Sequence, residues 1–191
     1  MIRNADKLER LLAEVHTWVR EVAHPNETRV AEQDEVPQDI VADMAARGFF
    51  GWSIPEEYGG LGLTTEELVM GAMELSQCAV AYRARVGTNT GIGSEALVAD
   101  ATEAQKRKYL PLMARGEATG CLALTEPNAG SEASNIETTA RRVGDHYVLN
   151  GMKRYITNAP IADLFTVFAR TDPDSTGARG ITAFIVERGF E

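Results

Sequence analysis

The sequence predicts an α+β protein in which an all-helical region precedes an antiparallel sheet. Apolar residues recur every three or four positions through the first two thirds of the chain, which is the helical period. In the last third they alternate with polar residues between turn-forming segments, which is the strand period. We therefore expect two domains in series, an N-terminal helical domain over residues 1–117 and a β domain over residues 118–191.

The charge balance argues against several classes of partner. The 191 residues include 19 Lys and Arg against 28 Asp and Glu, which gives a net charge of −9. A chain this acidic repels phosphate backbones and anionic lipids, so we expect neither nucleic-acid nor membrane binding. No apolar run approaches the roughly 18 residues of a membrane span and no secretory signal opens the chain, so we expect a cytoplasmic protein.

The cysteines and histidines point to no metal site. Cys78 and Cys121 lie far apart and form no Cys-x-x-Cys pair, and the three histidines have no metal-ligand spacing. We expect both cysteines to be buried and reduced.

The first half of the chain predicts two helices and an ordered loop. Apolar residues at helical spacing run from Leu8 to Val22, and this helix is expected to end near Pro25. A second helix is expected to begin at Pro37 and to end at Gly48, because proline suits a helix start and glycine a helix end. Residues 52–63 contain one proline and three glycines, so we expect an ordered loop there.

Two capping boxes mark the starts of later helices. Thr64 is followed three residues later by Glu67, and Thr102 is followed by Gln105. The first of these helices is expected to extend to about Val80, and the second to end at Gly116.

The last third of the chain predicts a hairpin and two further strands. The dipeptide Gly144-Asp145 separates alternating segments at 138–143 and 146–150. Two β-rich runs at 164–169 and 181–186 are separated by turn-forming residues. Because the sequence stops soon after the last run, we expect an open sheet in a chain that is incomplete or that a partner completes.

Common catalytic motifs are missing or lie in the wrong context. Residues 91–96 match the G-x-G-x-x-A dinucleotide fingerprint, but they lie between helical segments, so a glycine-containing helix start is the better interpretation. There is no nucleophile elbow, no Walker lysine and no H-E-x-x-H. These absences argue against serine hydrolases, P-loop proteins and zinc proteases.

The segment that carries the most chemical information is CLALTEPNAGSE, at residues 121–132. A predicted strand leads into Thr125-Glu126-Pro127, and the residues that follow expose backbone amides and a hydroxyl in a tight loop. Such a loop suits a phosphate group. Taken alone, the segment leaves a phosphate site and a plain surface turn equally open.

Together with KRYITN at residues 153–158, this segment resembles the acyl-CoA dehydrogenase family. That family builds its flavin site from an L-T-E-P-x-A-G-S-[DE] strand and loop and a K-x-[WFY]-I-T-N strand. IPEEYGGLG at residues 54–62 and QKRKYLP at residues 105–111 also look like family signatures, in the same order. The resemblance implies an N-terminal helical domain, a truncated β-barrel-like middle domain, and a C-terminal helical bundle that this chain lacks.

The resemblance also implies FAD as the cofactor and a set of cofactor-binding residues. These are Leu122, Ala123, Leu124, Thr125, Gly130, Ser131, Tyr155, Ile156 and Thr157. The first four would follow the isoalloxazine ring, the next two would meet the pyrophosphate, and the last three would line the ring face and its N5. Ser131 is also the position at which the family contacts its acyl-CoA substrate.

Three positions within these motifs need separate comment. Leu122 stands where many relatives have an aromatic residue, and Tyr155 stands where tryptophan is common, so redox potential or substrate choice is expected to differ. Carried over from the family, Glu126 is a structural carboxylate rather than a catalytic one.

The resemblance implies α,β-dehydrogenation of an acyl-CoA thioester, with hydride transfer to FAD and electrons passing to an electron-transfer flavoprotein. This would place the protein in fatty acid metabolism, as a homotetramer or another oligomer that completes the fold. The family's catalytic glutamate lies in the C-terminal bundle, so no catalytic residue is assigned here and the chain alone is expected to be inactive. Two alternatives stay open: a flavin oxidase or monooxygenase of the same fold, and a non-catalytic or partner-completed subunit of a split acyl-CoA dehydrogenase.

Overall fold

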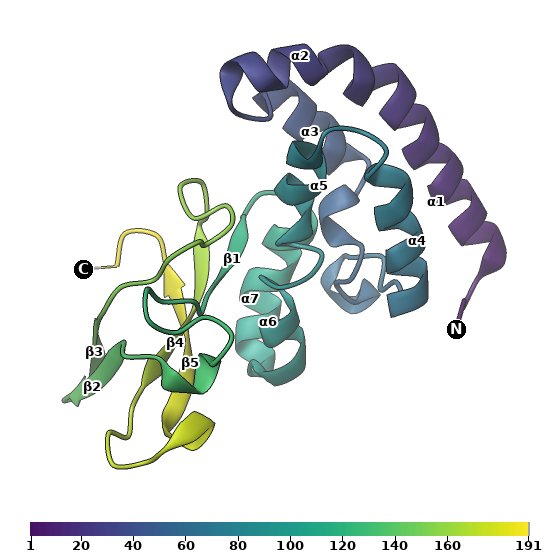
Figure 1. Ribbon diagram of the computed structural model, residues 1–191. Helices are drawn as coiled ribbons and strands as arrows, with labels where there is room; N and C mark the ends of the chain where they lie inside the picture. Colours follow the sequence, from purple (N-terminus) through teal and green to yellow (C-terminus); the bar gives the residue numbers. More distant parts are fainter. Residues whose placement is uncertain (191) are drawn as a thin grey trace. The chain divides into compact units, whose positions relative to one another are not determined.

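The computed structural model describes residues 1–190, and the chain divides into two compact units between Ala118 and Thr119. The first unit is helical and the second is built on a β-sheet (Figure 1). This arrangement confirms the predicted α+β class. The α-helices of the first unit are α1 (Ala5–Trp18), α2 (His24–Gln33), α3 (Gln38–Ala46), α4 (Thr65–Leu75), α5 (Val80–Gly87), α6 (Glu95–Asp100) and α7 (Glu103–Ala114).

The first helix does not end at Pro25, so that prediction was wrong. A π-helical turn, η1 (Val19–Ala23), connects α1 directly to α2, and the His24 N–H donates to the Val19 carbonyl five residues back. Proline in a helix removes one N–H donor and crowds the carbonyl four residues earlier. The wider π turn just before Pro25 opens the helix at that point, and the helix continues as a curved rod (Figure 1).

The core of the helical unit is built around Trp18. Its buried ring meets the rings of Phe49 and Tyr82 edge-on, with centroid distances of 5.4 and 5.5 Å. Its indole N–H donates to the Asp43 carboxylate at 2.6 Å, and the Tyr82 hydroxyl donates to the Ala23 carbonyl at 3.1 Å. Each polar atom of these aromatic residues is therefore satisfied inside an apolar cluster.

Both predicted capping boxes are present, at Thr64 and at Thr102, but the helix after Thr64 is shorter than expected. It ends at Leu75 rather than near Val80. The Ala79 N–H donates to the Glu27 carboxylate at 2.7 Å instead of continuing the helix, and α5 begins at the next residue. A side chain from a distant helix thus binds the backbone at the start of α5, which no local pattern indicates.

The predicted loop at 52–63 is ordered by its own backbone. Three backbone hydrogen bonds connect its two sides. The N–H of Leu61 donates to the Gly51 carbonyl at 2.8 Å, that of Gly62 to the Ile54 carbonyl at 2.8 Å, and that of Leu63 to the Trp52 carbonyl at 2.7 Å. This crossing brings Gly60 so close to the opposite strand of the loop that a Cβ there would lie 1.9 Å from the Ile54 carbonyl oxygen. Only glycine fits this position.

The second unit contains β1 (Gly120–Ala123), β2 (Thr139–Val143), β3 (His146–Asn150), β4 (Leu164–Arg170) and β5 (Ile181–Glu187). The predicted hairpin is confirmed as β2–β3, and β4 pairs antiparallel with β5 along its whole length. However, β1 pairs parallel with β4, so the sheet is mixed rather than wholly antiparallel. Residues 124–163 lead the chain back to the starting end of β1 before β4 begins, which makes the pair parallel. Within residues 1–190 the sheet does not close into a barrel.

We expect Gly60→Ala to lower the free energy of unfolding by about 3 kcal/mol, because the added methyl group overlaps the Ile54 carbonyl in a loop that three hydrogen bonds hold in place. Gly59→Asn is the matched control. It adds a side chain at a neighbouring glycine with open space around it and a φ of +85°, which asparagine tolerates. Urea unfolding of both variants measures the difference, and equal stability of the two would contradict this steric account.

Candidate functional site

The structure brings the two motif segments of the sheet unit together. The Arg154 N–H donates to the Thr125 carbonyl at 2.8 Å, and the Lys153 ammonium donates to the Leu124 carbonyl at 3.1 Å. The segments are separated by almost thirty residues of chain, including the whole β2–β3 hairpin. Leu122, Ala123, Leu124 and Thr125 therefore lie beside the loop that carries Tyr155, Ile156 and Thr157.

A buried ion pair holds this junction. The Lys153 ammonium lies 2.8 Å from the Glu126 carboxylate, and the two side chains are only 12% and 2% exposed. The same carboxylate accepts the N–H groups of Glu137 at 2.5 Å and Thr138 at 3.0 Å. Burial alone would raise the pKa of Glu126, but Lys153 and the N–H donors outweigh burial and lower that pKa to about 2.

Glu126 thus has the structural role that the resemblance implies for it. Lys153 lies within the second motif, but the sequence analysis assigned it no role. Its partner lies 27 residues away, and no spacing pattern connects the two.

The loop from Glu126 to Thr138, which we call the 126–138 loop, is closed at its base by the Glu126 carboxylate. It begins with a reverse turn in which Glu126 and Ala129 exchange backbone hydrogen bonds at 2.9 and 3.3 Å. Gly130 and Ser131 follow and are exposed. Within residues 1–190 their backbone N–H groups donate to no other part of the chain, so the loop offers two adjacent donors to solvent.

Nothing in the fold of the described residues requires a glycine at position 130. A Cβ built there meets no atom within 4 Å, and the residue does not adopt the left-handed conformation that favours glycine. The missing side chain leaves space for a ligand to approach the backbone N–H groups of the loop directly.

Tyr155 is held in an unusual conformation. Its φ is +59°, a left-handed backbone conformation that costs free energy for a bulky residue, and its side chain is 78% exposed. The Arg154 guanidinium lies 4.5 Å from the centroid of its ring. Residues 153–158 form no strand, which differs from the strand that the resemblance implies, because the left-handed turns at Tyr155 and Asn158 prevent an extended ladder.

The remaining predicted residues divide between the two faces of the sheet. Ala123 and Ile156 line an apolar groove of about 570 Å³, whose other walls come from the segment between β3 and β4, from β4 and β5, and from the segment after β5. Leu122 precedes Ala123 in β1, so its side chain points to the opposite face. Thr157 is exposed in the turn that follows Ile156, and Thr125 is half-buried.

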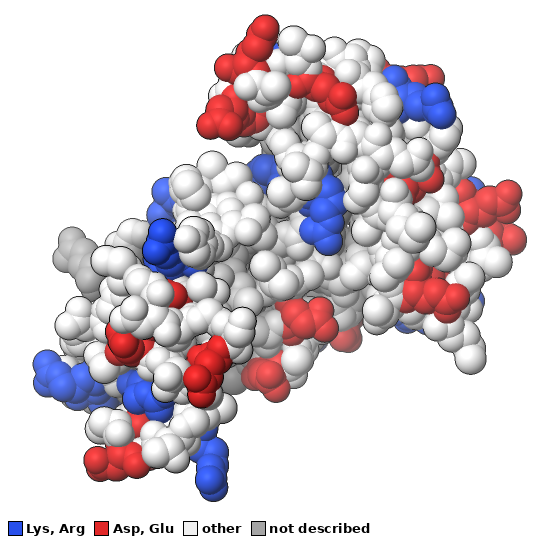
Figure 2. Space-filling view, in the orientation of Figure 1, with Lys and Arg blue, Asp and Glu red and all other residues white. Residues whose placement is uncertain are grey.

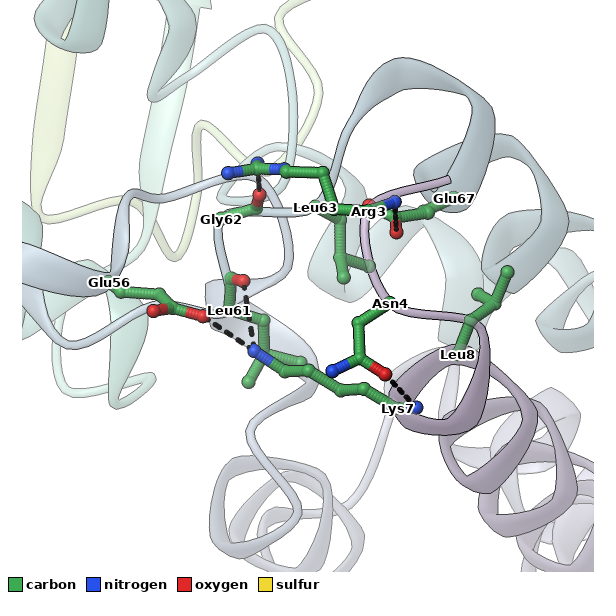
Figure 3. Close-up of a pocket in the computed structure, with 9 residues that line it drawn as sticks. All are labelled: Arg3, Asn4, Lys7, Leu8, Glu56, Leu61, Gly62, Leu63 and Glu67. Carbon is green, nitrogen blue, oxygen red and sulfur yellow. Dashed lines mark hydrogen bonds and ion pairs between the residues drawn. The ribbon is translucent and has the colours of Figure 1, made fainter. Parts of the chain in front are cut away.

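The helical unit has a cavity of its own, of about 200 Å³, shown in Figure 3. Lys7 reaches across it to the Glu56 carboxylate at 2.6 Å, and the Arg3 side chain donates to the Gly62 carbonyl. The Glu67 carboxylate accepts the backbone N–H groups of Thr64 and Arg3, which lower the pKa of Glu67 to about 2. These polar groups bind one another across the cavity, and their hydrogen bonds connect the N-terminal segment and α1 to α4 and to the 52–63 loop.

The charged residues on the face shown in Figure 2 are unevenly distributed. Acidic side chains gather over the end of α2 in Figure 2, and basic and acidic residues are mixed elsewhere on that face. The sequence at that end of α2 contains the exposed residues Glu32, Asp34 and Glu35. Within residues 1–190 no three His, Cys, Asp or Glu side chains are placed to hold a metal ion. No helix in that range has both the length and the apolar composition to cross a bilayer.

Comparison with known proteins assigns both units. In class, a helical unit followed by a sheet with these two motif loops corresponds to two consecutive domains of one enzyme family. Residues 5–117 match the family model for the acyl-CoA dehydrogenase N-terminal domain, and residues 121–191 match the model for the acyl-CoA dehydrogenase middle domain. The chain therefore belongs to the acyl-CoA dehydrogenase family, as the sequence motifs predicted.

Individual relatives agree with this assignment. The 3-(aryl)acrylate reductase of Clostridium sporogenes is 44% identical over 183 residues, which are 91% of this chain and 48% of the relative. The short-chain specific acyl-CoA dehydrogenase of Clostridium acetobutylicum is 38% identical over 181 residues, which are 93% and 48% of the two chains. An acyl-CoA dehydrogenase from Bacillus anthracis, solved with FAD, is 34% identical with a TM-score of 0.86 over 98% of this chain and 32% of that one. The chain spans about half the length of the curated relatives it matches.

We expect Glu126→Gln to lower the free energy of unfolding by about 3 kcal/mol, because it leaves the Lys153 ammonium buried without its counter-charge. The double variant Glu126→Gln with Lys153→Met is the control. It removes both charges and should lose less than the single variant. Urea unfolding of the two proteins gives the comparison, and a double variant less stable than Glu126→Gln would argue against the ion pair.

The ion pair also predicts an acid-sensitive fold. The folded pKa of Glu126 is about 2, below the ordinary value of 4.5, so its contribution to stability is complete above about pH 4.5 and is lost as the pH falls toward 2. The difference in unfolding free energy between the parent protein and Glu126→Gln should therefore shrink between pH 5 and pH 3. A constant difference across that range would mean that the Glu126 carboxylate is not the titrating group.

Proposed function

We propose that this protein is an FAD-dependent enzyme that dehydrogenates an acyl-CoA thioester between its α and β carbons. The observation that carries the proposal is the junction at Glu126 and Lys153, which fixes two loops side by side while leaving a hydroxyl, two N–H donors and an aromatic ring exposed. The chain's membership of the acyl-CoA dehydrogenase family supports it. We further propose that residues 1–117 form the N-terminal domain and residues 118–191 part of the middle domain.

The proposed flavin-binding residues are Leu122, Ala123, Leu124, Thr125, Gly130, Ser131, Tyr155, Ile156 and Thr157. The donors at Gly130 and Ser131 suit an anionic pyrophosphate, and the space left by the missing Cβ at Gly130 allows it to approach the backbone. The exposed ring of Tyr155 suits the flat face of a flavin. Backbone strain at that residue is the kind of local cost that functional loops retain.

When bound, FAD would supply the acceptor for a hydride from the β carbon of the substrate. The role of this chain's residues is to bind and orient. The hydroxyls of Thr125 and Thr157 are neutral donors, and a neutral donor placed beside a site of developing negative charge stabilises that charge without a proton transfer. Ser131 would serve both the cofactor and the acyl-CoA substrate.

The proposal extends to the setting of the reaction. We infer a role in fatty acid metabolism, an electron-transfer flavoprotein as the acceptor of the electrons, and a cytoplasmic oligomer, with a homotetramer as the family's arrangement. Tyr155 stands where tryptophan is common in the family, and Leu122 stands where many relatives have an aromatic residue. We propose these two positions as determinants of redox potential or substrate preference.

One relative favours a second candidate reaction. The 3-(aryl)acrylate reductase is named for reduction of a carbon–carbon double bond next to a carboxyl group, which is the reverse of dehydrogenation. The same binding residues serve either direction, because the transition state for hydride transfer is shared. We therefore propose reduction of an α,β-unsaturated acyl substrate as the alternative.

Assays in both directions test the proposal. The 191-residue chain alone is expected to be inactive, because no catalytic base is assigned to it. Joined to the C-terminal bundle that the resemblance implies, the protein should contain FAD, and we expect it to oxidise at least one of a panel of short, medium and branched acyl-CoA thioesters with an artificial dye as acceptor. The corresponding α,β-unsaturated thioesters, with a reduced dye as the electron donor, test the reverse reaction. Protein that retains no flavin after reconstitution and turns over no substrate in either direction would overturn the proposed function.

We expect Ser131→Ala to weaken FAD binding by about 1.5 to 3 kcal/mol, the range for one hydrogen bond to a charged group, because the backbone donors of the loop remain. Ser134→Ala, three residues later in the same loop, removes a hydroxyl outside the proposed contact and should bind FAD as the parent does. Dialysis against increasing volumes, with flavin measured by absorbance, compares them. Equal retention by both variants would show that Ser131 makes no contact with the cofactor.

A further inference from the structure

The last residue of β4, Arg170, has a backbone fixed from two sides. Its N–H donates to the Thr138 carbonyl at 2.7 Å, and it pairs with Thr139 of β2 and with Ile181 of β5. The start of its side chain is therefore anchored in the sheet, at the point where the 126–138 loop enters β2. A long side chain with a rigid base holds its far end more precisely than one on a mobile loop.

The guanidinium of Arg170 joins two short 3-10 helices, η4 (Ala133–Asn135) and η5 (Gly177–Gly180). One nitrogen donates to the Ser134 carbonyl in η4 at 2.8 Å. The other donates to the carbonyl of Ser175, just before η5, at 3.1 Å and to that of Gly177, the first residue of η5, at 3.4 Å. Gly180 makes room for it, since a Cβ there would lie 3.0 Å from the guanidinium.

These contacts give the 126–138 loop a second anchor. The Glu126 carboxylate holds its two ends together through the N–H groups of Glu137 and Thr138. Arg170 holds the Ser134 carbonyl on the far side of the exposed residues. Gly130 and Ser131 lie between the reverse turn at Glu126 and this anchor, so the conformation of their N–H groups depends on both.

The charge of Arg170 is not neutralised by its partners. Its three acceptors are carbonyl oxygens, and it forms no ion pair among residues 1–190. The 126–138 loop itself carries Glu132 and Glu137, neither of which is paired with a cation in that range. Without a nearby positive charge, the field of these carboxylates would oppose an anionic ligand at the exposed N–H groups.

We propose that Arg170 is a positioning residue for the pyrophosphate of the cofactor. It holds the 126–138 loop in a conformation in which the N–H groups of Gly130 and Ser131 can both donate to the pyrophosphate. Its positive charge also offsets the negative charge of the loop. The inference rests on the proposed function, since it requires that this loop bind the pyrophosphate. The isoalloxazine ring is served by other residues, so Arg170 should affect the phosphate-bearing part of the cofactor selectively.

The experiment compares FAD with riboflavin, which has the same ring system and no phosphate. Dissociation constants for both are measured on flavin-free protein by fluorescence quenching, for the parent, Arg170→Met and Arg179→Met. Arg179 is an exposed arginine of η5 with no bond to the 126–138 loop, so its variant removes the same charge without removing the anchor. We expect Arg170→Met to weaken FAD binding at least tenfold and riboflavin binding less than twofold, and Arg179→Met to change neither by more than twofold.

The outcomes separate the inference from the function on which it rests. If the parent binds FAD no more tightly than riboflavin, the loop does not recognise pyrophosphate and the proposed phosphate site fails. If the parent prefers FAD and Arg170→Met keeps that preference, the role of Arg170 is overturned while the proposed function stands. Equal losses for both ligands would mean a merely structural residue and would also overturn it.

Arg170→Lys provides the test if the methionine variant does not fold. Lysine keeps the positive charge but reaches one carbonyl in place of three, because its ammonium is a single point and not a planar fork. We expect it to weaken FAD binding at least threefold with riboflavin binding unchanged. FAD binding equal to that of the parent would show that the bridge between η4 and η5 does not position the loop.

Discussion

The candidate site depends on one buried carboxylate. Glu126 is removed from water and accepts hydrogen bonds from an ammonium and two backbone N–H groups, which together offset the cost of burying its charge. These three donors come from segments on both sides of the β2–β3 hairpin. The Glu126 side chain therefore joins the 126–138 loop to the loop after β3, and neither loop contains a strand or an α-helix that would hold the two together.

The parts of the fold that local chemistry determines could be predicted from the sequence. The capping boxes at Thr64 and Thr102 and the turn at Gly144-Asp145 each require only a few neighbouring residues, and each is present. The start of α5 at Val80 could not be predicted, because the N–H of its N-cap residue Ala79 binds the carboxylate of Glu27 on a distant helix. The parallel pairing of β1 with β4 escaped prediction for a similar reason, since the path of forty intervening residues decides it.

The site shows the same division. The motifs around Thr125 and Tyr155 locate the two loops, because a short run of residue types carries that information. The residues that fix the loops in space, Lys153 and Arg170, act on partners 27 and 36 residues away. Their contacts are to one carboxylate and to backbone carbonyls, which every residue possesses, so no pattern of side chains marks them. Anchors of this kind become visible only when the chain is folded.

The π turn before Pro25 also changes how the long first helix faces the core. In a regular helix, Val30 would be rotated by about 120° from Trp18, and the two side chains could not lie on one face. Both are buried. The π turn takes up one extra residue, which reduces that rotation to about 20° and realigns α2 with α1. The apolar positions of α2 are therefore shifted by one residue relative to the helical period of α1. Removing one residue between Val19 and Ala23 would give a continuous α-helix in which α1 and α2 keep the same rotational alignment. In that helix the Pro25 ring would crowd the carbonyl four residues earlier.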